Sequence, residues 1–149
     1  MSAPQVRGQR LAEWERDGLK AALRGAGLPL GGLDDPRRSF WRFSTPDDLT
    51  VGFGGLAVHG RDALLHSVVS LPPLRGRGFG RRIVETLEVE ARVMGSRTLW
   101  VATGNQQDFF AHLGYAATPR ASAPQPIQAT PELAQESGAP ATLMTKRTA

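Results

Sequence analysis

A glycine- and arginine-rich stretch at residues 71–80, LPPLRGRGFG, has the composition of an anion-binding turn. An apolar, β-branched run precedes it and an amphipathic helical pattern leaves it at Phe79, so a strand, a turn and a helix are predicted in succession. Because glycine carries no Cβ, successive backbone N–H groups can converge on an anion at the positive end of the helix. We interpret the stretch as a site for a pyrophosphate or a similar multiply charged group. The glycines are Gly76, Gly78 and Gly80, and the arginines in and beside the stretch are Arg75, Arg77, Arg81 and Arg82.

The same composition is also that of a plain turn with solvated charges. Two better-known phosphate loops do not fit. A Walker A loop needs Lys-Ser or Lys-Thr after its last glycine, and neither follows Gly80. The dinucleotide fingerprint G-x-G-x-x-G also fails, because the glycines here fall at spacings of two and two.

Read as Arg75-Gly76-Arg77-Gly78-Phe79-Gly80, the stretch resembles the acetyl-CoA loop of the Gcn5-related N-acetyltransferase (GNAT) superfamily, R/Q-x-x-G-x-G/A. Pro72 also stands where that family often has a proline. A second segment, DFFAHLGY at residues 108–115, resembles the family's aromatic-x-x-x-Gly-Phe block through Phe110, Gly114 and Tyr115. The resemblance is good over residues 49–115 and loose towards both ends.

Within the superfamily, three stretches look closest to small bacterial acetyltransferases associated with arsenic resistance. The resemblance implies an amino-acid-like amine as the acceptor. The stretches are residues 22–29, residues 71–88 and the FF-x-x-LGY ending.

The resemblance implies acetyl-CoA as co-substrate, with its pantetheine arm paired to the backbone of the strand before the loop. The pyrophosphate would then sit on the N–H groups of residues 76–81. Ser70 departs from the apolar residue usual at its position, but a backbone contact tolerates it. The cofactor-binding residues implied are Val68, Val69, Ser70, Arg75, Gly76, Arg77, Gly78, Phe79, Gly80, Arg81, Thr103 and Phe110.

The catalytic residues of the family carry over less well. Many relatives have a tyrosine where Phe110 stands, as the acid that protonates the leaving thiolate, and phenylalanine has no proton to give. Some have a glutamate base near the position of Ala102. Either the enzyme works by positioning acetyl-CoA against a neutral amine, or other groups move the protons. We name His66 as the candidate base, with an unperturbed pKa near 6.5; the alternative is a histidine hydrogen-bonded at a strand surface.

Other polar residues have two interpretations each. Thr103 is placed at the mouth of the pantetheine slot, where it contacts substrate or pantetheine, or else caps a helix at residues 106–113. Three arginines either clamp a substrate carboxylate or lie in a solvated loop, and we expect His112 to be exposed. The arginines are Arg37, Arg38 and Arg42.

Composition limits the remaining classes. The chain of 149 residues predicts one domain, 1–149, with a loop-rich part at 121–141. It has no cysteine and three scattered histidines, so we predict neither a disulfide nor a metal site.

No apolar run approaches the roughly 20 residues needed to cross a bilayer, and the N-terminus lacks an apolar signal core, so a cytoplasmic protein without membrane contact is expected. The net charge of +4 also admits a nucleic-acid-binding protein, but the arginines are dispersed and lack interleaved exposed aromatics.

Hydrophobic periodicity and turn residues predict an α/β domain with a mixed sheet. The resemblance implies that this sheet is mostly antiparallel and flanked by helices. The resemblance adds splayed central strands, here Ala63–Leu71 and Thr98–Ala102, that leave a slot for the pantetheine arm. Gly52, Gly54 and Gly55 predict a bulge or a close backbone approach. The other expected strands are Val6–Leu11, Ser39–Ser44, Leu49–His59, Tyr115–Arg120 and Leu143–Lys146, and the expected helices are Trp14–Ala26, one from Phe79 to Gly95, Asp108–Leu113 and a short one from Thr130.

The function predicted is direct transfer of an acetyl group from acetyl-CoA to the amine of a small, amino-acid-like substrate. No cysteine is present to carry an acyl intermediate. The alternatives are a catalytically silent acetyl-CoA-binding module and, with less support, a nucleic-acid-binding protein. Small members of the superfamily are often dimers, which makes a homodimer the expected partner besides the small-molecule substrate.

Overall fold

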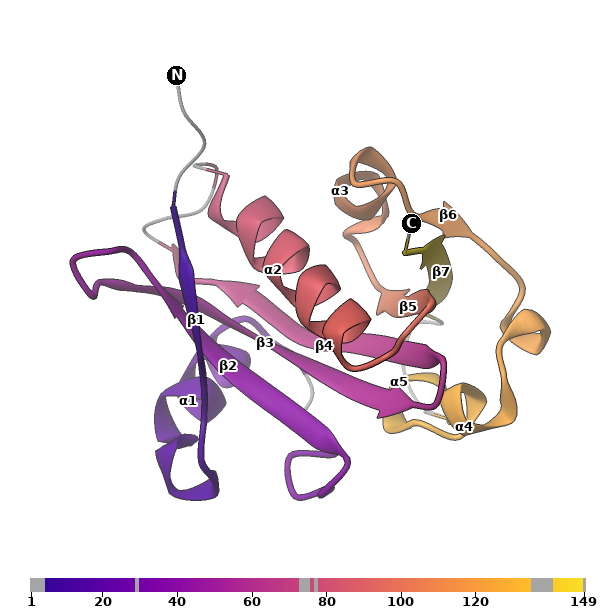
Figure 1. Cartoon of the computed structure of the whole chain (residues 1–149), viewed down its shortest axis with the longest axis horizontal. Coiled ribbons are helices and arrows are strands. Elements are labelled where there is room, and N and C mark those ends of the chain that lie inside the picture. Colours follow the sequence, from indigo (N-terminus) through magenta and orange to yellow (C-terminus); the bar gives the residue numbers. More distant parts are fainter. Residues whose placement is uncertain (1–4, 29, 73–75, 77, 135–140, 149) are drawn as a thin grey trace.

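The computed structural model describes residues 5–28, 30–72, 76, 78–134 and 141–148. Within them, seven strands form one sheet in the order β1-β2-β3-β4-β5-β7-β6 (Figure 1). The pair β4–β5 is parallel and the other pairs are antiparallel, which confirms the mixed, mostly antiparallel α/β architecture. The strands are β1 (Arg7–Arg10), β2 (Arg38–Ser44), β3 (Thr50–His59), β4 (Asp62–Ser70), β5 (Thr98–Thr103), β6 (Ala116–Ala117) and β7 (Thr142–Arg147).

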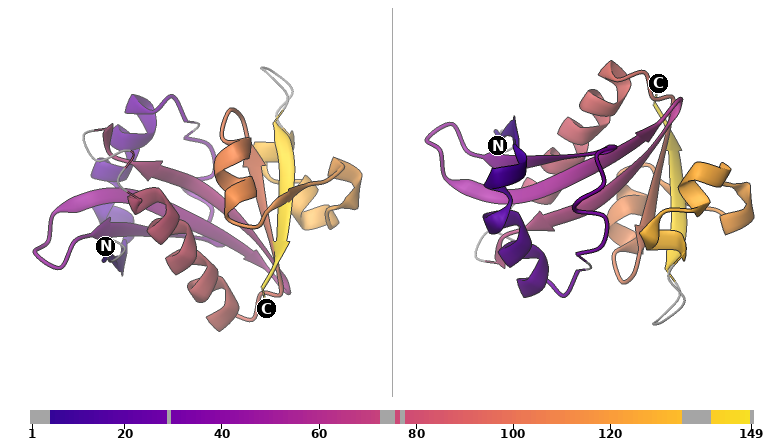
Figure 2. Two further views of the ribbon diagram at one scale, coloured as in Figure 1. Left: turned by 90° about the horizontal axis from the view of Figure 1, so that it is seen from above. Right: turned by 90° about the horizontal axis from the view of Figure 1, so that it is seen from below.

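Helices cover both faces of this sheet (Figure 2). On one face lie α2 (Phe79–Val93) and α3 (Gln107–His112), which share a core cluster with β2 to β5. On the other face lie α1 (Asp17–Gly25), α4 (Gln125–Gln128) and α5 (Pro131–Ala134). None of the helices in the described residues is long and apolar enough to span a bilayer.

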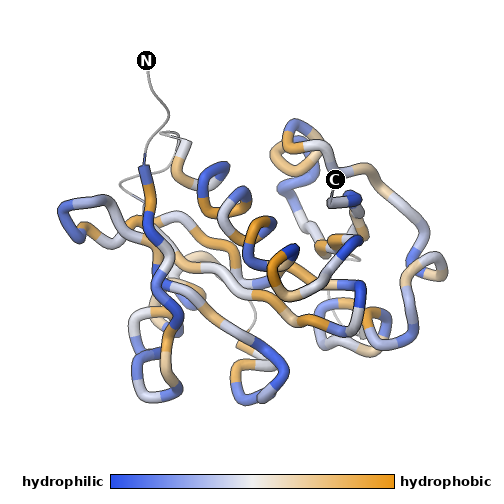
Figure 3. The backbone as a smooth tube through the Cα atoms, in the orientation of Figure 1, coloured by the Kyte–Doolittle hydropathy of each residue, from blue (hydrophilic) through white to orange (hydrophobic). Residues whose placement is uncertain are grey.

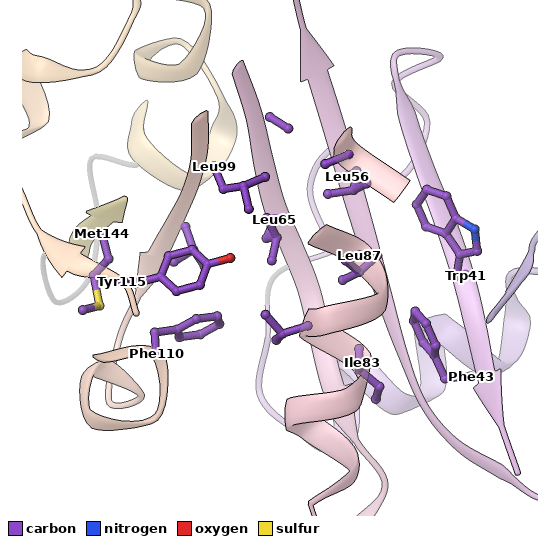
Figure 4. Close-up of a cluster of buried hydrophobic side chains, with 14 of the residues drawn as sticks. Trp41, Phe43, Leu56, Leu65, Ile83, Leu87, Leu99, Phe110, Tyr115 and Met144 are labelled. Atoms are coloured by element: carbon purple, nitrogen blue, oxygen red, sulfur yellow. The ribbon is translucent and has the colours of Figure 1, made fainter. Parts of the chain in front are cut away.

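The long helix α2 packs against β3 because that strand carries glycines beneath it. Hydrophilic and hydrophobic stretches alternate along α2 (Figure 3), and its apolar side includes Ile83 and Leu87, which face the sheet (Figure 4). A Cβ added to Gly52 would lie 2.8 Å from Ile83 Cδ1, and one added to Gly54 would lie 2.7 Å from Leu87 Cδ1. The predicted close approach at these glycines is therefore confirmed.

A β-bulge near the end of β4 changes which face of the sheet its last side chains point to. The register between β3 and β4 shifts between Phe53 and Gly55, and Ser67 opposite them has a left-handed φ of 58°. An extra residue of this kind locally reverses the alternation of side chains. As a result Val68 packs with the α2 side of the sheet and Val69 with the α1 side.

Three sequence expectations differ from the structure. The helix expected over Trp14–Ala26 is a 3₁₀ turn (Glu13–Glu15) followed by α1. The strand expected over Tyr115–Arg120 shrinks to β6, because Tyr115 turns into the core and a 3₁₀ turn begins at Arg120. The loop-rich part expected at 121–141 contains α4, whose Ile127 is fully buried. Proline suits the first turn of a helix, where its missing N–H costs nothing.

Candidate functional site

A gap opens between β4 and β5 on the way to the glycine-rich stretch. Their pairing ends at Leu65 and Val101, although β4 continues to Ser70 and β5 to Thr103 (Figure 1). The strands therefore part as the resemblance implied.

The edge of β4 beside this gap presents backbone polar groups. Leu71 donates its N–H to Val51 across the β3 side, and the carbonyl of Val69 lies against Gly52 on that same side. Because successive residues of a strand turn their N–H and C=O groups to opposite edges, Val68 and Ser70 direct theirs towards the gap. An extended amide chain lying in the gap could thus pair with β4 as another strand would.

The gap leads to the N-terminus of α2. Gly76 has φ 81° and Gly78, the residue that precedes the helix, has φ 83°, a conformation that glycine adopts without strain. Arg82 donates the first intrahelical bond, to the Gly78 carbonyl at 3.3 Å, so helix geometry leaves the N–H groups of Phe79, Gly80 and Arg81 without intrahelical acceptors. No acidic residue stands in the first turn of α2. An anion is therefore favoured here.

The predicted arginines of the loop are only partly within the described residues. Arg75 and Arg77 lie outside them. Arg81 and Arg82 are in α2, where both approach Glu85, at 3.6 Å and 3.3 Å. Their charge is therefore shared with that carboxylate.

Gly80, in the first turn of α2, lies next to Ser70 on β4 and Phe109 on α3. A Cβ built on it would lie 3.3 Å from Ser70 Oγ and 3.4 Å from Phe109 Cζ. These three residues border the gap together. The sequence analysis did not name Phe109 as a site residue. The Phe-Phe pair at 109–110 could have indicated it, because adjacent side chains on a helix point in different directions.

Phe110 belongs to the core of the molecule. It is 2% exposed, and its ring packs edge-to-face on Phe109 and Tyr115 at centroid distances of 5.0 Å and 5.4 Å. Figure 4 shows Phe110 beside Tyr115. Tyr115 donates its hydroxyl to Glu88 at 2.8 Å, and burial together with that carboxylate raises its pKa far above its usual value. Tyr115 therefore keeps its proton and does not replace the missing acid.

Thr103 is buried at the end of β5, beside the gap. Its hydroxyl donates to the Thr142 carbonyl at 3.0 Å, and the residue that precedes α3 is Gln106. The capping interpretation of Thr103 is therefore wrong. A contact between its hydroxyl oxygen and the cofactor or substrate remains a prediction.

His66 lies on the α1 side of β4 and is only 4% exposed. Its ring packs edge-to-face on Phe40, and its Nδ1 is 3.1 Å from Ser67 Oγ. Burial, and next the charge of Arg38, lower the pKa of His66 to about 3. The expectation of an unperturbed pKa is therefore wrong. His66 is a neutral and weak base at neutral pH, and its catalytic role remains a prediction.

The low pKa of His66 predicts a pH dependence of stability. Because its pKa falls from 6.5 in the unfolded chain to about 3 in the folded one, the unfolded state binds more protons between those values. The contribution is complete above pH 6.5 and is lost as the pH falls. Between pH 7 and pH 5 the wild type should lose about 2 kcal/mol more than His66→Gln. Urea unfolding at both pH values measures this difference, and parallel losses in the two proteins would contradict it.

Arg38 also differs from its expected role. It is buried, and it donates to both carboxylate oxygens of Glu132 on α5, at 2.7 Å and 2.6 Å. Burial alone would raise the pKa of Glu132, but the bonds and charge of Arg38 outweigh it and the pKa is lowered. The Arg38 guanidinium is therefore bound to Glu132 within the protein, so Arg38 is neither solvated nor available to bind a substrate carboxylate. Arg37 also pairs with Asp35, at 3.2 Å, but its side chain is 67% exposed, which agrees with the solvated-loop interpretation for this residue.

Within the described ranges, no group of three or more His, Cys, Asp or Glu side chains could hold a metal ion. The site described above consists of backbone amides, a helix N-terminus and aromatic rings. Such an arrangement suits an extended amide chain that ends in phosphates.

Comparisons with known proteins agree with this geometry. The family model described as an acetyltransferase (GNAT) domain matches residues 37–117, more than half of the chain. Mouse N-alpha-acetyltransferase 80 (Mus musculus) is 56% identical over 52 residues, which are 35% of this chain and 17% of that protein. The chain therefore spans much less than two thirds of that relative.

Solved structures share the fold at low identity. N-acetylglutamate synthase from Neisseria gonorrhoeae, complexed with coenzyme A and N-acetyl-glutamate, superposes with a TM-score of 0.79 at 15% identity, over 98% of this chain and 36% of that one. A Mycobacterium tuberculosis protein solved with CoA gives 0.73 at 19% identity, over 98% and 100%. With the family match over residues 37–117, we conclude that the chain belongs to the acetyltransferase (GNAT) domain family.

Proposed function

We propose that this chain transfers an acetyl group from acetyl-CoA to the amine of a small, amino-acid-like acceptor. The observation that carries the proposal is the gap beside β4, which runs from two outward-facing backbone segments, at Val68 and Ser70, to the N-terminus of α2. The name of the mouse relative, an N-alpha-acetyltransferase, and the resemblance to the arsenic-resistance group both support an α-amine as the acceptor.

The residues present fit acetyl-CoA as a substrate. The backbone at Val68 and Ser70 would pair with the pantetheine amides, and the N–H groups of residues 79–81 would bind the pyrophosphate. Phe109 and Gly80 would border the arm between them. Each contact is made by backbone or by a ring, so the cofactor is held by shape and by the helix terminus more than by individual charges.

The transfer itself needs one bond to form and one to break. The neutral amine attacks the thioester carbonyl carbon, the carbon–sulfur bond breaks, and the amine proton passes to water. The thiolate leaves without an acid, because Phe110 has no proton to give and Tyr115 holds its own. Positioning of two reactants can contribute about 7–11 kcal/mol to catalysis, which makes an acid dispensable.

Thiol release from acetyl-CoA, monitored with a panel of amino acids and other amines, tests this function. We expect release with at least one α-amine, together with a rise in Tm on addition of acetyl-CoA. Binding without turnover across the panel would favour the silent acetyl-CoA-binding module, which Phe110 and Ala102 suggest. A protein that neither binds acetyl-CoA nor is stabilised by it would refute both.

Phe110→Tyr tests whether the missing acid limits the rate. The thiol of coenzyme A has a pKa not far above the roughly 8.5 of a free cysteine, so the thiolate leaves at modest cost and turnover should change less than about tenfold. The added hydroxyl enters an apolar cluster and should lower the free energy of unfolding by about 1–3 kcal/mol. Steady-state kinetics and urea unfolding measure the two effects. A hundredfold gain in kcat would show that the wild type lacks a needed acid.

A further inference from the structure

Ser67, in the β-bulge of β4, has a backbone conformation that a serine side chain does not favour. Its φ is 58°, and the register shift between Phe53 and Gly55 leaves Ser67 and Val68 together opposite the single residue Gly54. A bulge whose first residue is left-handed normally has glycine there, because a Cβ is strained in that conformation. Serine in this place lowers the stability of the fold, and strain of this kind is concentrated at functional sites.

Among the described residues, one other non-glycine residue has a positive φ. This is Asp48, with φ 66°, in the turn between β2 and β3. Aspartate is common in left-handed turns because its short polar side chain tolerates that conformation. Serine has no such preference, so the strain at Ser67 needs an explanation that Asp48 does not.

Ser67 also stands where the proposed acetyl-CoA path ends. The last paired residues of β4 and β5 are Leu65 and Val101. The proposed phosphate site is at the N-terminus of α2, beyond Ser70, so the pantetheine arm would run back along β4 past Val68. Its thioester end would then lie beside Ser67, before the two strands close. Ser67 is half-buried there, and a bound molecule can therefore reach it.

His66 holds the hydroxyl group of Ser67. Its Nδ1 is 3.1 Å from Ser67 Oγ, while its Nε2 is buried and has no hydrogen-bond partner among the described residues. A buried N–H without an acceptor is rarer than a buried acceptor without a donor, so we assign the ring proton to Nδ1. Burial lowers the pKa of His66 and keeps the ring neutral, so it carries one proton. Nδ1 then donates to Ser67 Oγ, and the hydroxyl hydrogen stays free to be donated elsewhere.

We infer that the Ser67 hydroxyl donates a hydrogen bond to the thioester carbonyl oxygen during the attack of the amine, and that His66 is a positioning residue that acts through Ser67. The inference rests on the proposed acetyl transfer. Negative charge gathers on that oxygen when the amine adds to the carbonyl carbon, and a donor fixed in advance stabilises it more than mobile water does. Ser67 keeps its proton throughout, and the amine proton still passes to water.

Ser67→Ala and Ser67→Gly test this role together, because both remove the hydroxyl but only glycine relieves the strain. We expect kcat to fall about a hundredfold in both variants, while the Kd for acetyl-CoA stays within about twofold. In urea, Ser67→Gly should be more stable than Ser67→Ala. If Ser67 served only the fold, activity would follow stability and the glycine variant would be the more active. That result, or an unchanged kcat in either variant, would overturn the inference.

Asp48→Gly is the matched control, because it removes the other left-handed non-glycine residue. The Asp48 carboxylate is 78% exposed and pairs with Arg42 at 3.1 Å, at the end of the sheet where β2 turns into β3. Its kcat should stay within about twofold of the wild type. A loss like that of Ser67→Ala would show that turnover responds to any such backbone change, and would overturn the inference.

His66→Leu tests whether His66 acts through Ser67. It removes the Nδ1 donor, so kcat should fall about tenfold in the wild-type background and show no further fall in the Ser67→Ala background. Equal losses in the two backgrounds would mean that His66 acts on its own, as a base would, and would overturn its positioning role.

The outcomes separate this inference from the function on which it rests. A wild-type protein that acetylates none of the amines would refute both. Turnover by the wild type, with kcat retained in Ser67→Ala, would overturn the role of Ser67 and leave acetyl transfer standing.

Discussion

Replacement of Gly80 by valine is expected to weaken acetyl-CoA binding at least a hundredfold, about 2.7 kcal/mol, while the fold stays nearly as stable. The reason lies in the direction of the missing side chain, which would point between Ser70 Oγ and Phe109 Cζ. Contacts of 3.3 Å and 3.4 Å need only small shifts of their neighbours, so a Cβ is tolerated. The further methyl groups of valine would occupy the space proposed for the pantetheine arm. Isothermal titration with acetyl-CoA and urea unfolding measure the two effects.

Gly80 separates cofactor binding from folding better than Gly78 does. Gly78 has a left-handed φ of 83°, so any other residue there would be strained and would also lower the stability of the fold. Gly25→Val serves as the control, because it changes a helical glycine on the opposite face of the sheet, where a Cβ meets nothing within 4 Å. It should leave acetyl-CoA affinity unchanged. Losses of affinity and stability in equal measure at Gly80 would mean that this glycine serves only the local packing.

Removal of Arg38 is expected to destabilise the fold strongly. Arg38→Met leaves the Glu132 carboxylate without the partner that offsets its burial, and loss of one member of a buried ion pair costs about 3–5 kcal/mol. The side chains of Arg38 and Glu132 are 2% and 16% exposed, so water can replace little of the lost interaction. Urea unfolding at pH 7 gives the free energy of each variant.

The double variant Arg38→Met/Glu132→Leu is the control for this prediction. It removes both charges and should be more stable than Arg38→Met alone, since an apolar pair of similar volume avoids the desolvation penalty. The lowered pKa of Glu132 in the wild type adds a pH signature. Its contribution is present above the unfolded value near 4.5 and is lost as the pH falls through the folded pKa, so wild type and Arg38→Met should converge in acid. A constant difference down to pH 3 would contradict the role of the ion pair.

The parts of the fold that sequence predicted well are those with a regular pattern. Ile83 and Leu87 repeat at the helical interval, and the helix begins at Phe79 as expected. The apolar run at Thr98–Ala102 has its place in the middle of the sheet, between β4 and β7. Local patterns of this kind determine local structure, and the tertiary contacts agree with them.

The rest depended on residues that are distant in sequence. His66 owes its low pKa to burial and to Arg38, and Arg38 is in turn held by Glu132, which is 94 residues away from it. No local pattern brings these segments together. Ile127 stands alone among prolines and small residues, too few apolar positions for a period to be visible, and yet it is fully buried. Phe109 was missed because adjacent aromatic rings cannot be assigned to core or site without the helix axis.

The parting of β4 and β5 has a consequence for how long the molecule survives in a cell. A ligand that fills the gap adds hydrogen bonds which only the folded chain can make, so its binding energy becomes folding energy. At a free concentration one hundred times the Kd, acetyl-CoA would add about 2.7 kcal/mol to the resistance against unfolding. Proteases act mainly on the opened chain, so a bound ligand such as the proposed acetyl-CoA would protect the protein from them.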